Sequence, residues 1–177
     1  GYIEVAKRIT AKGRPQDAIR LLEPLTTDKR VSWNPLLWST LADAAQKASV
    51  PKRAAEARAR AEREAEAIAA TFGQTVATKE ALKKSERAAR AGAYFDTVAS
   101  DYPRALQAYR EAYRLTPNDL VAANNLGYLL AEHGTTPDDF AEAVRLTQSV
   151  IEKAPAPHPV FLDSFGWALY KRGDAQK

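Results

Sequence analysis

The chain has 177 residues, with 26 Lys and Arg against 22 Asp and Glu, for a formal net charge of +4 at pH 7. It contains no cysteine, which excludes disulfides, thiolate metal sites and cysteine nucleophiles. No apolar run approaches the ~18 residues that a membrane-spanning helix needs. Alanine supplies much of the apolar content and aromatic residues make up only 8%. We therefore expect a core built by close helix approach instead of bulky side chains.

Helical periodicity dominates the sequence from end to end. A plausible N-cap, Asn34, precedes Pro35, and Asp101 has the same place before another helix. Gly73 and Gly173 are suited to the left-handed conformation that ends a helix. The predicted helices span 2–12, 15–25, 35–47, 51–70, 78–99, 103–115, 119–133, 138–153 and 159–172.

Two segments near the C-terminal end, 124–130 and 163–170, share one helical pattern with a glycine at the same place. Recurrence at about one helix pair indicates stacked repeats, in which one unit cannot bury its apolar face alone. The small residues of this pattern are expected where two helices pack most closely, because a larger side chain would separate them. They are Gly127, Gly166, Ala42 and Ala6.

These residues resemble the tetratricopeptide (TPR) repeat, a helix-turn-helix unit of 34 residues. The residues that carry the resemblance most clearly are Ala105, Tyr109, Ala112, Pro117, Leu126, Gly127, Leu130, Ala143, Val150, Pro155, Phe165, Gly166 and Leu169. The last repeats also resemble TPR proteins of the bacterial envelope, including those that serve polysaccharide export and outer-membrane assembly. The resemblance implies an all-α fold, a right-handed superhelix of antiparallel helical hairpins.

The resemblance divides the chain into five repeats, the first two of them degenerate. These are 1–32, 33–73 (elongated), 78–117 (with a long first helix), 118–157 (with an insertion in the turn at 134–139) and 158–177 (truncated). Because the first residue is Gly1 and the chain stops soon after a turn signal, we expect a piece of a longer protein. The compartment stays open between bacterial periplasm, outer-membrane association and cytoplasm.

A TPR array presents a groove lined mainly by the first helix of each hairpin. The positions expected to face a partner there are Asn124, Tyr128, Glu132, Asp163, Trp167, Lys171, Ser39 and Asp43. An asparagine one turn below an aromatic ring suits peptide capture, since the amide can bond an extended backbone while the ring covers apolar side chains. The alternative is that Tyr128 and Trp167 pack against neighbouring helices with only a polar edge exposed.

Other functions have weaker support in the sequence. Lys79, Lys83, Lys84, Arg87 and Arg90 form the best candidate for an anion or nucleic-acid surface, although acidic residues dilute them and a solvated face is the simpler interpretation. The cations of a carboxylate clamp, which holds a peptide's C-terminal carboxylate, do not occur at the matching places.

No residue pattern indicates chemistry. His133 and His158 lack a partner at metal-ligand spacing and are expected in surface or capping roles. Asp138 and Asp139 are expected to cap a helix. We therefore predict a non-catalytic protein-interaction scaffold without a metal or cofactor, binding a peptide or protein partner within a multi-protein assembly. Self-association and polyanion binding through the basic helix 78–99 remain alternatives, and nucleic acid is the less favoured partner.

Overall fold

The computed structural model describes residues 1–75 and 77–173, apart from the side chains of residues 78 and 79. In these ranges the chain is all-α, as the sequence predicts. The helices are α1 (Tyr2–Ala11), α2 (Pro15–Leu22), α3 (Pro35–Lys47), α4 (Pro51–Ala69), α5 (Thr78–Thr97), α6 (Tyr102–Leu115), α7 (Leu120–His133), α8 (Pro137–Lys153) and α9 (Pro159–Arg172), with a short 3₁₀ helix η1 (Glu23–Thr26) after α2.

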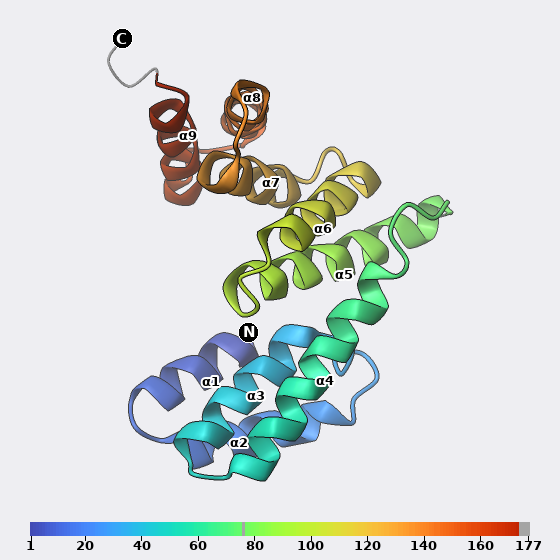
Figure 1. The fold of residues 1–177 in the computed structure, drawn as a ribbon, viewed down its shortest axis with the longest axis vertical. Coiled ribbons are helices and arrows are strands. Elements are labelled where there is room, and N and C mark those ends of the chain that lie inside the picture. Colours follow the sequence, from blue (N-terminus) through green and yellow to red (C-terminus); the bar gives the residue numbers. More distant parts are fainter. Residues whose placement is uncertain (76, 174–177) are drawn as a thin grey trace.

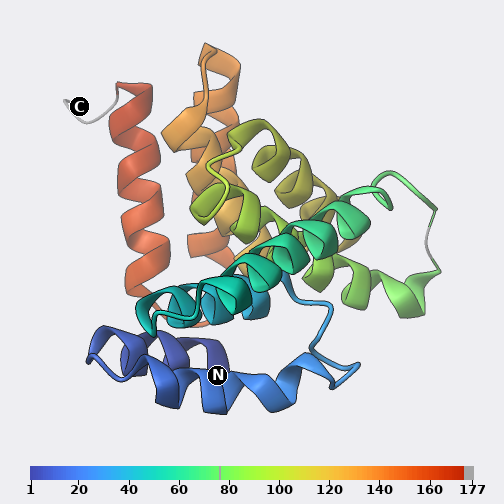
Figure 2. The same ribbon diagram turned by 60° about the horizontal axis from the view of Figure 1, so that its bottom comes forward.

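The helices pack as antiparallel hairpins in chain order. The pairs α1–α2, α3–α4, α5–α6 and α7–α8 have the most extensive contacts, and α9 packs on both α7 and α8. The long axis follows the sequence, with α1 to α4 at one end, α5 and α6 between, and α7 to α9 at the other end (Figure 1). Helix α9 stands at the edge of the array with one side turned away from the other helices (Figure 2).

Local signals in the sequence set most of the helix bounds. The Asn34 side chain accepts a hydrogen bond from the Leu36 amide at 3.0 Å, and Asp101 accepts one from the Arg104 amide at 3.1 Å. Gly173 ends α9 in the left-handed conformation with φ of 87°. The predicted helix 15–25 ends early, at Leu22, and continues as η1, because Pro24 cannot donate the next helical hydrogen bond.

The connection between α7 and α8 is shorter than the sequence indicates. Only residues 134–136 lie between the two helices, because Pro137 already begins α8. Thr136 is the N-cap, and the Asp139 carboxylate accepts hydrogen bonds from the amides of Thr135 and Thr136 at 3.1 and 3.0 Å. These contacts form a capping box between Thr136 and Asp139. The N-cap is therefore Thr136 and not Asp138, while Asp139 takes part in capping as expected.

The core consists mainly of alanine, as expected. A buried stripe along α4 consists of four alanines followed by Ile68. The alanines are Ala54, Ala57, Ala61 and Ala65. Similar alanines line α3, α6 and α7, and larger buried side chains such as Leu41, Phe95 and Leu126 pack among them. The hairpins are thus held by close backbone approach over a long contact.

The two equivalent glycines have different surroundings. A Cβ atom on Gly127 would lie 2.7 Å from Cγ2 of Thr147 and 3.3 Å from the carbonyl oxygen of Ala143, both on α8. A Cβ atom on Gly166 would meet nothing within 4 Å. The expectation of close packing is therefore confirmed for Gly127 and wrong for Gly166, because no described helix covers that side of α9.

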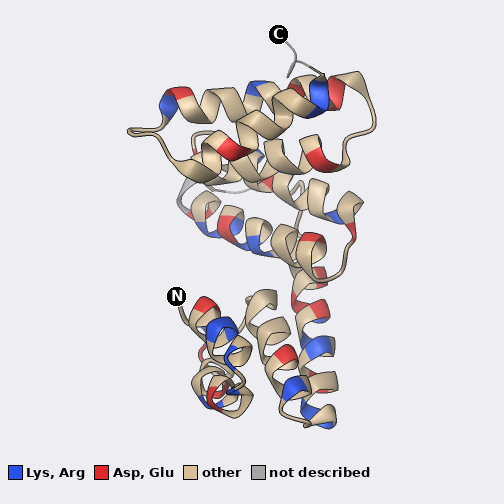
Figure 3. Ribbon diagram, turned by 90° about the vertical axis from the view of Figure 1, so that its left-hand side faces the viewer, with Lys and Arg blue, Asp and Glu red and all other residues tan. Residues whose placement is uncertain are grey.

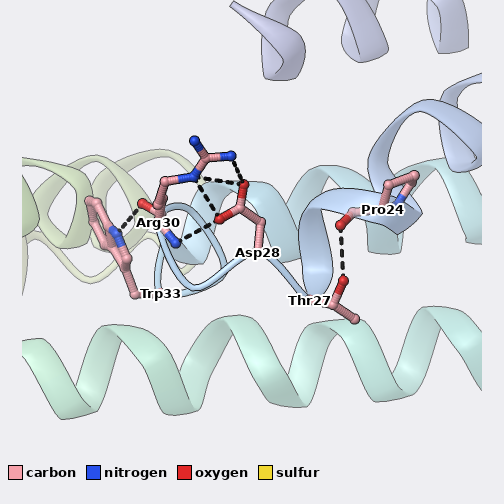
Figure 4. Close-up of polar contacts among 5 residues, drawn as sticks. All are labelled: Pro24, Thr27, Asp28, Arg30 and Trp33. Atoms are coloured by element: carbon pink, nitrogen blue, oxygen red, sulfur yellow. Dashed lines mark hydrogen bonds and ion pairs between the residues drawn. The ribbon is translucent and has the colours of Figure 1, made fainter.

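The connector between η1 and α3 is ordered by polar contacts of its own (Figure 4). The Arg30 guanidinium donates to the Asp28 carboxylate at 2.6 Å, and this contact lowers the pKa of Asp28 to about 2. The Trp33 indole N–H donates to the Arg30 carbonyl at 2.7 Å. The Arg87 guanidinium of α5 lies 5.1 Å from the Trp33 ring centre. The connector thereby joins the N-terminal hairpins to α5.

The glycine pair provides a matched test of the packing. Gly127→Ala should lower the free energy of unfolding by roughly 1–3 kcal/mol, because its methyl group overlaps α8. Gly166→Ala should raise it by about 0.5–1 kcal/mol, since alanine favours a helix and nothing obstructs it. Urea unfolding of both variants measures the difference. Equal destabilisation by both would show that Gly166 is also packed against another helix.

Candidate functional site

Basic and acidic side chains are mixed over most of the array. Basic and acidic residues follow one another along α4, and both signs occur on the other hairpins (Figure 3). Among the described residues, the ion pairs between helices include Arg53 with Glu23 at 2.8 Å and Arg110 with Glu142 at 3.0 Å. Surface pairs of this kind contribute little each. The exception to the even distribution is a group of carboxylates on α5, α7 and α9 that act electrostatically on Tyr128.

Four of the residues predicted to face a partner come together on α7 and α9. The Trp167 indole N–H donates to the Glu132 carboxylate at 2.7 Å, and the Lys171 ammonium lies 5.3 Å from the Trp167 ring centre. Tyr128, one turn before Glu132, remains 40% exposed. The i,i+4 spacing on each helix places these side chains on adjoining stripes, as the sequence predicts.

A third helix adds a carboxylate that the sequence analysis missed. Asp96, near the end of α5, is half-buried, and burial raises its pKa, with Glu132 adding to the rise and His133 opposing it. The pKa of Tyr128 is likewise raised, first by burial and then by Glu132, Asp96 and Asp163. We call Asp96, Tyr128, Glu132, Asp163, Trp167 and Lys171 the Tyr128 cluster. It brings three carboxylates around one exposed ring.

Two residues predicted to face a partner are buried instead. Ser39 is 7% exposed, and its hydroxyl donates to the Leu36 carbonyl at 3.2 Å, so it is a core residue of α3. Asn124 is 4% exposed, and its Oδ1 has no hydrogen-bond partner among the described residues. Asp43 is exposed on α3, in the N-terminal half of the array. Periodicity alone does not separate a groove position from a neighbouring core position.

A cleft of about 370 Å³ between α5 and α7 leads toward the Tyr128 cluster. Its walls include the exposed side chains of Leu82 and Val121. Ala93 of α5 and Asn125 of α7 lie at its other end, each three residues before a member of the cluster. Because residues three apart are neighbours on a helix surface, the cleft adjoins Asp96 and Tyr128. We call it the α5–α7 cleft.

The basic residues of α5 do not form one free surface. Arg87 lies against the Trp33 ring, and Arg90 is 4.0 Å from Glu86. Lys84 is half-buried and close enough to Glu111 to lower the pKa of that carboxyl, an effect secondary to that of Arg114. Lys83 is exposed, and the side chain of Lys79 lies outside the described part of the structure. The expected anion surface is therefore divided among several environments.

The two histidines are in different settings. The His133 ring stacks on Tyr102 with a centre-to-centre distance of 3.4 Å, and it is half-buried at the last residue of α7. His158 is exposed beside Phe161, with ring centres 4.8 Å apart. Within residues 1–75 and 77–173 no group of three or more potential ligands could hold a metal ion. None of the helices in these ranges is long and apolar enough to cross a membrane.

The fold and the site define an all-α array of helical hairpins with an aromatic and acidic cluster on one face. No protein-family model matches the chain, and no curated protein matches it. Among solved structures the chain is similar to YrrB, described as a TPR protein with an unusual peptide-binding site. That superposition has a TM-score of 0.48 and 17% sequence identity, and it covers 98% of this chain and 77% of YrrB.

The raised pKa of Asp96 predicts a pH-dependent stability. A folded-state pKa above the unfolded value means that the charged carboxylate destabilises the fold. This destabilisation is complete at pH values above the folded pKa and absent at pH values below the unfolded pKa of about 3.9. Asp96→Asn should therefore be more stable than the parent chain at pH 7. The difference should shrink as the pH falls and vanish below about pH 4.

Thermal unfolding of the two chains across this pH range measures the effect. Asp43→Asn, at an exposed position, is the matched control and should leave the midpoint nearly unchanged at every pH. A lower midpoint for Asp96→Asn at pH 7 would mean that the charged carboxylate stabilises the fold.

Proposed function

We propose that this chain is a non-catalytic interaction scaffold that binds a peptide or protein partner on the face of the Tyr128 cluster. The observation that carries the proposal is an exposed tyrosine, Tyr128, one helical turn from the Glu132 carboxylate that holds the Trp167 indole in place. Tyrosine and tryptophan are the side chains that most often dominate binding energy at interfaces. Rings held in one orientation before binding lose less conformational entropy.

Contacts within the chain explain the position of the Trp167 ring better than that of the Tyr128 ring. The Trp167 indole has its hydrogen bond to Glu132 and lies beside Tyr170, with ring centres 5.3 Å apart. Tyr128 has no ring or cation contact among the described residues and leaves two-fifths of its surface exposed. A partner that covers Tyr128 would bury apolar area that this chain leaves in water.

The resemblance of the last repeats to bacterial envelope proteins suggests where to look for the partner. An assembly for polysaccharide export or outer-membrane construction is the first setting that we propose. In such an assembly the chain would hold components together without acting on them chemically.

Self-association is a second candidate, favoured by the outer side of α9. Leu162 and Tyr170 are each about half or more exposed there, on the stripe of α9 that contains Gly166, and Gly166 leaves room for another helix. Polyanion binding receives less support, because Arg87 and Arg90 have partners within the chain. A sedimentation measurement of the chain at several concentrations distinguishes self-association from a monomeric scaffold.

Selection from a random linear peptide library displayed on phage tests the main proposal. Peptides selected on the immobilised chain should bind Tyr128→Ala and Trp167→Ala more weakly, with a loss of about 2 kcal/mol, or roughly thirtyfold in Kd, for each ring. Isothermal titration with synthetic peptides gives the affinities. Tyr2→Ala removes an exposed ring from α1 and is the control.

Circular dichroism of each variant establishes that it is folded. Selected peptides whose affinity is unchanged in both ring variants, or a library that yields no binder, would refute a binding face at the Tyr128 cluster.

A further inference from the structure

The shape and the charges of the face where α5 meets α7 lead to a specific class of partner. The α5–α7 cleft has apolar wall residues on both helices, and Ser85, Glu86, Arg90, Asp119 and Asn125 also line it. The apolar ones are Leu82, Ala89, Ala93, Val121 and Ala122. The Tyr128 cluster adjoins the cleft and supplies further carboxylates.

The length of this surface fits a short extended segment. From Leu82 to Asp96 the helical rise of about 1.5 Å per residue gives about 21 Å. An extended chain advances about 3.3 Å per residue, so about six residues span this distance. Alternate side chains of such a segment point to the same side, which allows apolar residues to enter the cleft while a residue near one end reaches the cluster.

The Tyr128 cluster has an excess of negative charge. Asp96, Glu132 and Asp163 all lie close enough to Tyr128 to raise its pKa. The basic side chains that face them are Lys171, which lies over the Trp167 ring, and His133, which stacks on Tyr102, and Arg90 lines the adjoining cleft. Within the cluster, three carboxyl groups face one lysine. An added cation therefore finds a favourable potential, strengthened by the partial burial of Asp96.

Lys171 shows how this surface holds a cation. Its ammonium lies over an aromatic ring and 3.4 Å from the backbone carbonyl of Glu132. The Tyr128 ring, one turn away on α7, has no cation over it among the described residues. A second lysine or an arginine over Tyr128 would repeat the arrangement with Asp96 and Asp163 as its counter-ions.

We propose that the α5–α7 cleft and the Tyr128 cluster together bind an extended segment of about six residues, with apolar side chains in the cleft and a lysine or arginine over Tyr128 between Asp96 and Asp163. This proposal rests on the proposed function and adds the chemistry of the partner. It is the reverse of a carboxylate clamp, since here the protein supplies the carboxylates and the partner the cation.

The formal net charge of the chain helps to separate this proposal from non-specific attraction. At +4 the protein as a whole repels a cationic peptide. Attraction of such a peptide must therefore come from a local group of carboxylates, whereas capture of polyanions would follow from the overall charge.

The test uses the peptides selected from the random library on the parent chain. Their sequences should contain apolar residues together with a lysine or arginine at a fixed spacing. Replacement of that cation by glutamine in a synthetic peptide should weaken binding about tenfold or more. Asp96→Asn and Asp163→Asn should each produce a loss of the same order for the parent peptide and almost none for the glutamine peptide.

Asp96→Asn is the more informative variant, because it is expected to stabilise the fold and so cannot lose affinity by unfolding. Glu152→Gln, an exposed carboxylate on α8 outside the cluster, is the charge-matched control and should leave the affinity unchanged. A Leu82→Ser, Val121→Ser double variant tests the apolar wall residues of the cleft and should weaken both peptides alike, since their contacts do not involve the cation.

The possible failures are distinguishable. Peptides that require Tyr128 and Trp167 but show no preference for lysine or arginine would overturn this inference and leave the proposed function intact. Cationic peptides that bind equally to the parent chain, Asp96→Asn and Asp163→Asn would also overturn it, because their attraction would not come from the cluster. Loss of all binding that depends on the two rings would overturn the proposed function and this inference together.

Discussion

The close approach of helix backbones through small side chains is the constraint on which the rest of this structure depends. At Gly127 the distance between α7 and α8 leaves no room for even one methyl group against Thr147. Thr147 is small enough for this contact, and its hydroxyl donates a hydrogen bond to the Ala143 carbonyl at 2.8 Å. The alanine stripe of α4 extends the same principle along another hairpin. Dispersion summed over long, close contacts replaces the burial of large side chains.

Phe95 and Tyr109 are buried in this core, whereas the three tryptophans are each held by polar groups. The Trp38 indole N–H donates a hydrogen bond to the Ser32 carbonyl at 2.6 Å, and the guanidinium groups of Arg53 and Arg60 lie near its ring. Trp33 and Trp167 have equivalent arrangements of one hydrogen bond and one cation. Tyr128 differs because it has the exposed ring without the cation. Compared with the three tryptophans, the exposed Tyr128 ring on the proposed binding face therefore lacks a cation.

The sequence predicted the elements well because their signals are local. Asn34 and Asp101 cap the helices that follow them, and the glycine at 173 ends α9, each through contacts within a few residues. The short η1 and the three-residue turn before Pro137 were missed, although Pro24 and Thr136 are also local signals. At Pro24 the helical periodicity continued across a break that one residue enforces, whereas at 134–139 the predicted break was longer than the observed one.

The candidate site was predictable only in part, because its geometry depends on how hairpins stack. The i,i+4 pairs on α7 and α9 follow from one helix each, whereas the approach of Asp96 to Tyr128 requires the relative position of α5 and α7. The same dependence explains why Asn124 was expected to be open and is buried. It also explains Gly166, whose surroundings depend on whether another helix lies against α9. The repeat boundaries within 1–73 stay a prediction for the same reason.

Two energetic costs coincide on the face of the Tyr128 cluster. The half-buried Asp96 carboxylate opposes folding when charged, and the Asn124 carbonyl is buried without a donor. At the helix caps and at Gly127, by contrast, local preferences and packing agree. A protein whose only role were to fold would gain stability by replacing both groups. Local conflict of this kind is characteristic of functional sites, where a ligand supplies what the fold omits. A cation beside Asp96 would offset the cost of its charge, so a positively charged segment accounts for a feature that the folded chain leaves unexplained.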